Sequence, residues 1–179
     1  MNKVILFFNY EACFKHYTAA ILRMRQAKVH GETIVAKPVL LLALLEAMDE
    51  DVITNNRFHI DEWLEEKYNT LMEKFTKNSQ FEKIIGIEKP FWHLETDEFW
   101  HLKISTLFHE KGVTPSKHWL KENVEYAYLD ESLWIMLMHK EWRMNMRNFI
   151  CENKLKKKNI IKREKGRKNG YWLILKEKN

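Results

Sequence analysis

The chain has 179 residues, of which 45% are hydrophobic and 31% are charged. This length suits one well-buried domain, and this balance excludes a disordered or membrane-like chain. No stretch approaches the roughly 20 uninterrupted apolar residues that a membrane-spanning helix needs, and the apolar opening at 4–8 is shorter than the core of a signal peptide. We therefore expect a cytoplasmic protein with no membrane partner, in which Cys13 and Cys151 are reduced thiols.

The formal net charge of +5 is unevenly distributed along the chain. The run 154–168 holds nine Lys or Arg residues and one acid, a local net charge of +8, which leaves −3 for the remaining residues. A basic segment beside a slightly acidic body favours contact with phosphates through a patch rather than over the whole surface. A solvated C-terminal tail is the alternative interpretation.

The first part of the chain has the apolar spacing of helices. Residues 10–26 are predicted to form the first helix, with Asn9 as its N-cap. Pro38 suits the first turn of a second helix at 39–49, which is apolar on almost every side and should therefore lie at the centre of the core.

A third helix is predicted at 62–75, where Asp61 can cap it and apolar residues form one stripe. Between the second and third helices, residues 53–60 have a composition that could hold a short strand.

The middle of the chain has a different pattern. Two short apolar runs, 91–94 and 99–102, are joined by the polar residues 95–98, which predicts a hairpin with a four-residue loop. Residues 124–128 could supply a third strand.

The last part returns to helical spacing. Asp130 is expected to cap a helix at 131–138, a second helix is expected to run from Lys140 into the basic run, and residues 171–175 resemble a terminal strand. These elements predict a helix-dominated α+β fold with a small antiparallel hairpin or sheet, for which a winged-helix-like layout is one compatible arrangement. We divide the chain into a recognition domain at 1–153 and a basic extension at 154–179.

Four segments, in order, resemble one family of proteins. They are Lys37-Pro38-Val39-Leu40-Leu41-Leu42-Ala43-Leu44, Ile53-Thr54-Asn55-Asn56-Arg57-Phe58, Pro90-Phe91-Trp92-His93-Leu94 with Asp97, Phe99 and Trp100-His101-Leu102, and Ala127-Tyr128-Leu129-Asp130-Glu131-Ser132-Leu133-Trp134. The family is that of the N-terminal domains of HNH restriction endonucleases, which includes the sulfur-binding domains that recognise phosphorothioate-modified DNA. The resemblance covers about residues 9 to 150.

The resemblance implies a helix-rich domain that binds modified double-stranded DNA in a restriction or defence system and delivers it to an HNH nuclease. In the sulfur-binding members, a basic residue near the third motif and an apolar pocket hold the modified phosphate. Sulfur is larger and less strongly hydrated than the oxygen that it replaces, so an apolar pocket can select it while cations neutralise the neighbouring phosphates.

The candidate DNA contacts are basic residues beside apolar segments and in the basic run. They are Lys37, Arg57, His93, His101, Lys103, Lys156, Lys157, Lys158, Arg163 and Arg167. The competing interpretations are that the two histidines are packed polar tips and that Lys37 and Arg57 cap helices or form surface pairs. Most of the aromatic residues are expected in the core.

Catalytic patterns give no positive case for an enzyme. No His-Asn-His arrangement suits a metal-binding ββα unit, and the histidines lack Cys partners at zinc-ligand spacing, so no cofactor or metal is expected. We therefore expect a DNA-binding module without its own nuclease domain. Two alternatives stay open: an orphan interaction subunit that recruits a separate nuclease or regulator, and an enzyme whose site comes from residues scattered in the sequence.

Overall fold

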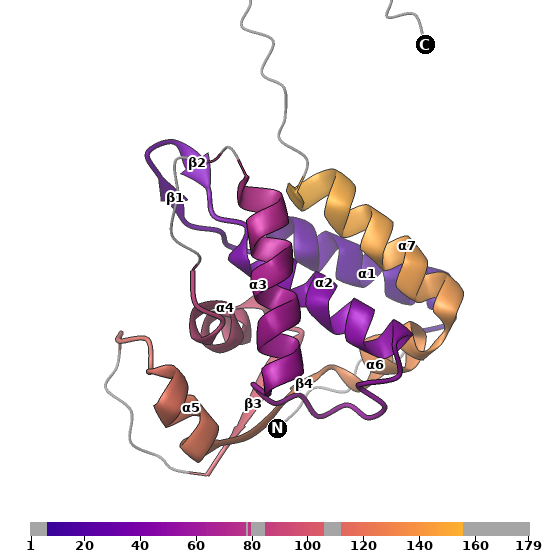
Figure 1. The fold of residues 1–179 in the computed structure, drawn as a ribbon. Coiled ribbons are helices and arrows are strands. Elements are labelled where there is room, and N and C mark those ends of the chain that lie inside the picture. Colours follow the sequence, from indigo (N-terminus) through magenta and orange to yellow (C-terminus); the bar gives the residue numbers. More distant parts are fainter. Residues whose placement is uncertain (1–6, 78, 80–84, 106–111, 156–179) are drawn as a thin grey trace, which may run out of the picture.

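The computed structural model describes residues 7–77, 79, 85–105 and 112–155. In these ranges, seven α-helices and the small β3–β4 sheet share one core, and a second small antiparallel sheet, β1–β2, contributes no residue to it (Figure 1). The helices are α1 Tyr10–Arg23, α2 Ala36–Asp49, α3 Glu62–Thr76, α4 Glu88–His93, α5 Lys117–Asn123, α6 Glu131–Met138 and α7 Lys140–Ile150. The strands are β1 Lys28–Val29, β2 Glu32–Thr33, β3 Trp100–Ile104 and β4 Val124–Leu129, and a 3-10 helix η1 (Leu94–Asp97) and a π-helical turn η2 (Cys151–Leu155) follow α4 and α7. The predicted helix-dominated α+β fold is confirmed.

Helix α2 forms the centre of the core, as its sequence predicts. Its residues from Val39 to Leu45 are all buried, and it packs against α3, α4 and α7 (Figure 1). The helix begins at Ala36 rather than at the predicted Val39, so that Pro38 lies in the first turn, where the missing N–H leaves no intrahelical bond unmade.

The predicted N-caps of α1 and α3 are confirmed. The Asn9 Oδ1 atom accepts a hydrogen bond of 2.9 Å from the N–H of Ala12, and Asp61 Oδ1 accepts one of 2.8 Å from the N–H of Leu64. Each cap satisfies a backbone donor that the first helical turn leaves without a partner. Helix α1 ends at Arg23, three residues before the predicted end.

The predicted hairpin between 91–94 and 99–102 is wrong. Residues 91–93 belong to α4, and β3 pairs in antiparallel register with β4, the predicted third strand, which is confirmed. Pro90 cannot donate to a strand ladder but suits the first turn of a helix, and the N–H of Phe91 bonds to the carbonyl of Ile87 at 3.0 Å. The indole N–H of Trp100 then donates to the carbonyl of Phe91, which packs α4 against β3.

The segment 53–60 forms one isolated bridge, between Phe58 and Ala127, instead of the predicted strand. Beside this bridge, the Asn56 side chain donates to the carbonyl of Leu129 at 2.8 Å and accepts from its N–H at 2.9 Å. The amide group of Asn56 thus pairs with β4 as a strand backbone would.

A short hairpin that the sequence analysis did not predict joins α1 to α2. Strands β1 and β2 pair through a two-residue turn in which His30 and Gly31 both have positive φ values, 49° and 81°. A type I′ turn requires positive φ at both central positions, which glycine adopts at no steric cost.

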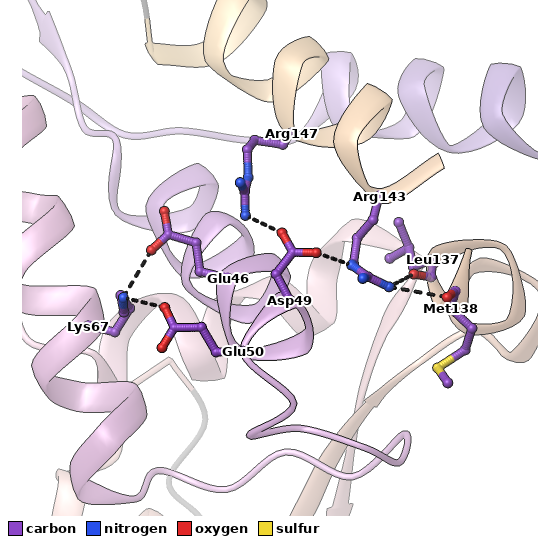
Figure 2. A network of polar contacts seen from close by, with 8 residues as sticks. All are labelled: Glu46, Asp49, Glu50, Lys67, Leu137, Met138, Arg143 and Arg147. Atoms are coloured by element: carbon purple, nitrogen blue, oxygen red, sulfur yellow. Dashed lines mark hydrogen bonds and ion pairs between the residues drawn. The ribbon is translucent and has the colours of Figure 1, made fainter. Parts of the chain in front are cut away.

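A polar network around Asp49 holds the end of α2 to α7 (Figure 2). The Asp49 carboxylate accepts from Arg143 Nε at 2.6 Å and from Arg147 Nη2 at 2.7 Å. Arg143 also donates through Nη1 to the carbonyls of Leu137 and Met138 at the end of α6. One carboxylate therefore connects three helices.

Both cysteines are free thiols, as expected, and burial raises the pKa of Cys13 to about 11. Over the part of the chain that the structure describes, no helix is long and apolar enough to cross a membrane. The predicted strand at 171–175 and the continuation of the last helix into the basic run lie outside the described residues.

Candidate nucleic-acid interface

An open pocket of about 570 Å³ lies between the end of α1, the start of α2 and α4. The segments before and after the β1–β2 hairpin also contribute to its wall. The lining residues are Arg25, Gln26, Ala27, Ile34, Ala36, Lys37, Ile85, Lys89, Pro90, His93 and Thr96. Below, we call this cavity the basic pocket.

The basic pocket combines positive charge with apolar surface. Four basic side chains line it, and among its described lining residues none is acidic. The small and apolar residues Ala27, Ala36 and Pro90 form part of the same wall. Such a surface can neutralise an anion and at the same time receive an atom that is weakly hydrated.

The first turn of α2 adds a further positive field to the pocket. Ala36 and Lys37 are its first two residues, no side chain caps it, and it has no acid in its first turn. The backbone N–H groups of Ala36 and Lys37, which no side chain caps, and the helix dipole at this end favour an anion.

Lys37 is held in place by an ion pair with Asp97. Its Nζ atom pairs with Asp97 Oδ2, and Asp97 Oδ1 accepts a hydrogen bond of 3.2 Å from the backbone N–H of Arg25. The Asp97 side chain is 4% exposed and that of Lys37 is 12% exposed. Asp97 therefore connects two basic residues of the pocket wall from below the surface.

His93, at the end of α4, has an imidazole whose pKa is lowered. Partial burial is the largest cause, and the charges of Lys37 and Lys89 add to it. The ring accepts or donates a hydrogen bond of 2.7 Å between Nε2 and the Thr114 hydroxyl. His93 is thus mostly neutral at pH 7 although it lies among cations.

Three other predicted contact residues gather on one face of the β3–β4 sheet. His101 and Lys103 alternate along β3 and so share a face, where they oppose Tyr128 and Tyr126 of β4. The guanidinium of Arg57 lies 4.9 Å from the centre of the Tyr126 ring. The surface formed by these five residues is called the sheet face below.

Asp130 does not cap α6 with its side chain, contrary to the prediction. Its carboxylate accepts instead from the Tyr17 hydroxyl at 2.9 Å and lies 2.6 Å from Nε2 of His101. The Tyr17 hydroxyl also bonds to Ser132 at 2.7 Å, and burial raises its pKa above the usual value. Asp130 thus orients the His101 ring on the sheet face.

The structure divides the predicted site residues into two groups. Lys37 and His93 line the basic pocket, whereas Arg57, His101 and Lys103 belong to the sheet face. The remaining five lie outside the described residues and are Lys156, Lys157, Lys158, Arg163 and Arg167.

Three residues that affect the charge of the basic pocket were not predicted from the sequence as site residues. Lys89 directly precedes Pro90 of the third motif, and this adjacency was the available signal. Arg25 follows the end of α1, and only the packing of α1 against η1 brings it to the pocket. Asp97 was visible in the motif, but its pairing with Lys37 joins residues 60 positions apart.

The basic run begins beside the same region. Lys154, its first residue, donates from Nζ to the carbonyl of Leu22 in α1 at 2.9 Å. Burial lowers the pKa of Lys154, and the charge of Asp97 partly opposes this effect. The described chain therefore ends near the part of α1 that leads into the pocket wall.

Groups of three or more His, Cys, Asp or Glu side chains able to hold a metal ion do not occur among the described residues.

Comparison with known proteins identifies the family. The model of the ScoMcrA-like DNA sulfur-binding domain family matches residues 15–161. Among solved structures, the sulfur-binding domain of SprMcrA complexed with phosphorothioated DNA is similar in fold, with a TM-score of 0.57 and 13% identity over 82% of this chain and 88% of that one. Curated proteins include no significant match. The chain belongs to the ScoMcrA-like DNA sulfur-binding domain family.

Proposed function

We propose that this protein binds double-stranded DNA carrying a phosphorothioate and receives the modified phosphate in the basic pocket. The observation that carries the proposal is the combination of three cationic side chains, His93, the uncapped start of α2 and apolar wall residues in one cavity. Membership of a family of DNA sulfur-binding domains supports it.

The selectivity for sulfur would come from desolvation. A phosphate oxygen loses strong hydrogen bonds to water when it enters a partly apolar cavity, whereas sulfur loses less. The cations of the pocket attract both kinds of phosphate, so they supply affinity and the apolar wall supplies discrimination.

The sheet face and the basic run would hold the flanking DNA backbone. Arg57, His101 and Lys103 present positive or protonatable groups beside two tyrosines, and the run from Lys154 adds eight further Lys or Arg residues to 168. These contacts would be independent of sequence and sensitive to salt. We treat 1–153 as the recognition domain and 154–179 as an extension that adds affinity.

We also propose that the module serves in restriction, in which a nuclease cuts the DNA that the module recognises. The membership of a McrA-type family of DNA sulfur-binding domains supports this role.

The decisive experiment compares two duplexes of the same sequence, one with a single phosphorothioate, across a salt series. A preference for the modified duplex that persists at high salt is expected, because desolvation is less sensitive to salt than phosphate contacts. Equal affinity for both duplexes at every salt concentration would overturn the proposed selectivity. Binding to neither would favour the protein-interaction alternative.

Matched variants assign the site. Lys89 is exposed on α4 and lines the pocket, and Lys140 is exposed at the start of α7 outside it. K89Q is expected to weaken binding of the modified duplex by roughly tenfold, the scale of one charge-assisted hydrogen bond, and K140Q by much less. Equal losses in both variants would contradict the assignment of the pocket.

A further inference from the structure

The basic pocket has an acidic residue directly behind its cationic wall. Asp97 is more than nine-tenths buried and is not among the residues that line the cavity. It pairs with Lys37, which does line the cavity. Its second carboxylate oxygen accepts from the backbone N–H of Arg25, so its position is fixed from two sides. Asp97 therefore reduces the positive charge that Lys37 presents to a ligand.

The ion pair also uses part of the hydrogen-bonding capacity of Lys37. An ammonium group has three N–H donors, and at least one of them points at Asp97 Oδ2. Fewer donors, and a smaller net field, remain for a phosphate in the pocket.

This reduction affects oxygen and sulfur differently. An ammonium approaches an oxygen more closely than the larger sulfur, and the Coulomb attraction falls with distance, so a free Lys37 would strengthen binding of an ordinary phosphate more than that of a phosphorothioate. The stronger attraction would compensate for the larger desolvation cost of oxygen. Discrimination between the two kinds of phosphate thus depends on limiting the attraction that Lys37 exerts on them.

We propose that Asp97 is a specificity-determining residue: by pairing with Lys37 behind the pocket wall, it disfavours ordinary phosphates and so widens the preference for phosphorothioate DNA. The inference rests on the proposed function of the basic pocket. Asp97 acts through Lys37 and is a positioning residue with no contact of its own to the phosphate.

The test measures the ratio of the two dissociation constants, ordinary duplex over modified duplex, in the full-length protein. D97N removes the charge with little change of shape, and it is expected to tighten binding of the ordinary duplex on the order of threefold to tenfold and of the modified duplex by less, so that the ratio narrows. The salt dependence for the ordinary duplex should steepen by about 0.9 in log–log slope, the equivalent of one more phosphate neutralised.

E98Q is the matched control because it changes the net charge equally. Glu98 is the next residue, its side chain is 80% exposed, and it lies 4.0 Å from the exposed Arg23. This variant should tighten binding of both duplexes slightly and leave the ratio unchanged. If the ratio narrowed in E98Q as well as in D97N, the change in net charge alone would explain the effect, and the proposal would be overturned.

Folding is monitored by circular dichroism, and D97S serves as a second variant because it also replaces the carboxylate by a smaller, uncharged polar group. A folded D97N or D97S protein with the wild-type ratio overturns the role of Asp97 while the proposed function stands. A wild-type protein that binds both duplexes equally overturns the proposed function itself, so the two failures are distinguishable.

Discussion

His93 is the residue whose protonation should respond to DNA. Its pKa is lowered by burial and by the cations Lys37 and Lys89, and a phosphate bound in the pocket would oppose both cations and raise that pKa. The complex then holds more protons than the free protein, so the dissociation constant should decrease as the pH falls from about 8 to about 6. Titration of a labelled duplex at several pH values measures this, and the dependence should be flatter in H93Q.

The stability of the free protein should depend on pH in the opposite direction: it should decrease as the pH falls, whereas DNA binding should become tighter. Because the pKa of His93 is lower in the folded state than in the unfolded chain, stability is full above the unfolded pKa near 6.5 and decreases as the pH falls below it.

H118Q is the control for the binding experiment, since His118 is 82% exposed on α5 and lies outside the pocket. Parallel pH profiles of binding for wild type, H93Q and H118Q would contradict the role of His93.

At the scale of elements, Asp49 should matter more than other surface acids. D49N weakens two short hydrogen bonds to arginines and loosens the attachment of α7 to α2 (Figure 2). Arg143 is only 11% exposed, and a poorly paired buried cation is costly, so we expect a loss of about 1–3 kcal/mol in the free energy of unfolding. Urea denaturation followed by circular dichroism measures it.

Lys67 supplies the comparison within the same region. It pairs with Glu46 at 3.3 Å and Glu50 at 2.9 Å, both partly exposed to solvent (Figure 2). Water and salt screen such pairs, so K67Q should cost at most about 1 kcal/mol. If K67Q destabilised the protein as much as D49N does, burial of Arg143 would not explain the cost of D49N.

Elements with many residues of regular spacing were predictable from the sequence, and short ones were not. Helices α2 and α3 have long apolar patterns and correct cap or first-turn residues, so local and tertiary preferences agree. The run 91–94 is too short for its period to distinguish a helix from a strand, and Pro90 before it, which suits the first turn of a helix, was the local signal for α4. The β1–β2 hairpin has two-residue strands and could be recognised only from His30-Gly31.

The residues of the candidate site were likewise predictable only where they lie in local motifs. Lys37 and His93 were identified because they lie in motifs, and the structure brings them to one cavity. Arg25 lines that cavity, and Asp97 lies behind its wall, only through packing between distant segments, which no local pattern encodes.

At the scale of the whole molecule, affinity and selectivity should reside in different parts of the chain. The basic pocket is built from described elements, whereas the densest cluster of positive charge along the chain is the run 154–168. Replacing Lys156, Lys157, Lys158, Arg163 and Arg167 by Gln in the full-length protein should weaken binding of both duplexes. The slope of log affinity against log salt should become shallower by about 0.9 for each phosphate that the variant no longer neutralises.

The ratio between the two duplexes is the informative quantity in that experiment. Phosphate contacts outside the pocket act equally on modified and ordinary DNA, so the ratio should stay at its wild-type value while both affinities fall. K89Q provides the contrast, because a pocket cation attracts oxygen more strongly than sulfur and its loss should therefore raise the ratio. If the ratio changed with the five substitutions and not with K89Q, the basic run rather than the pocket would contact the modified phosphate.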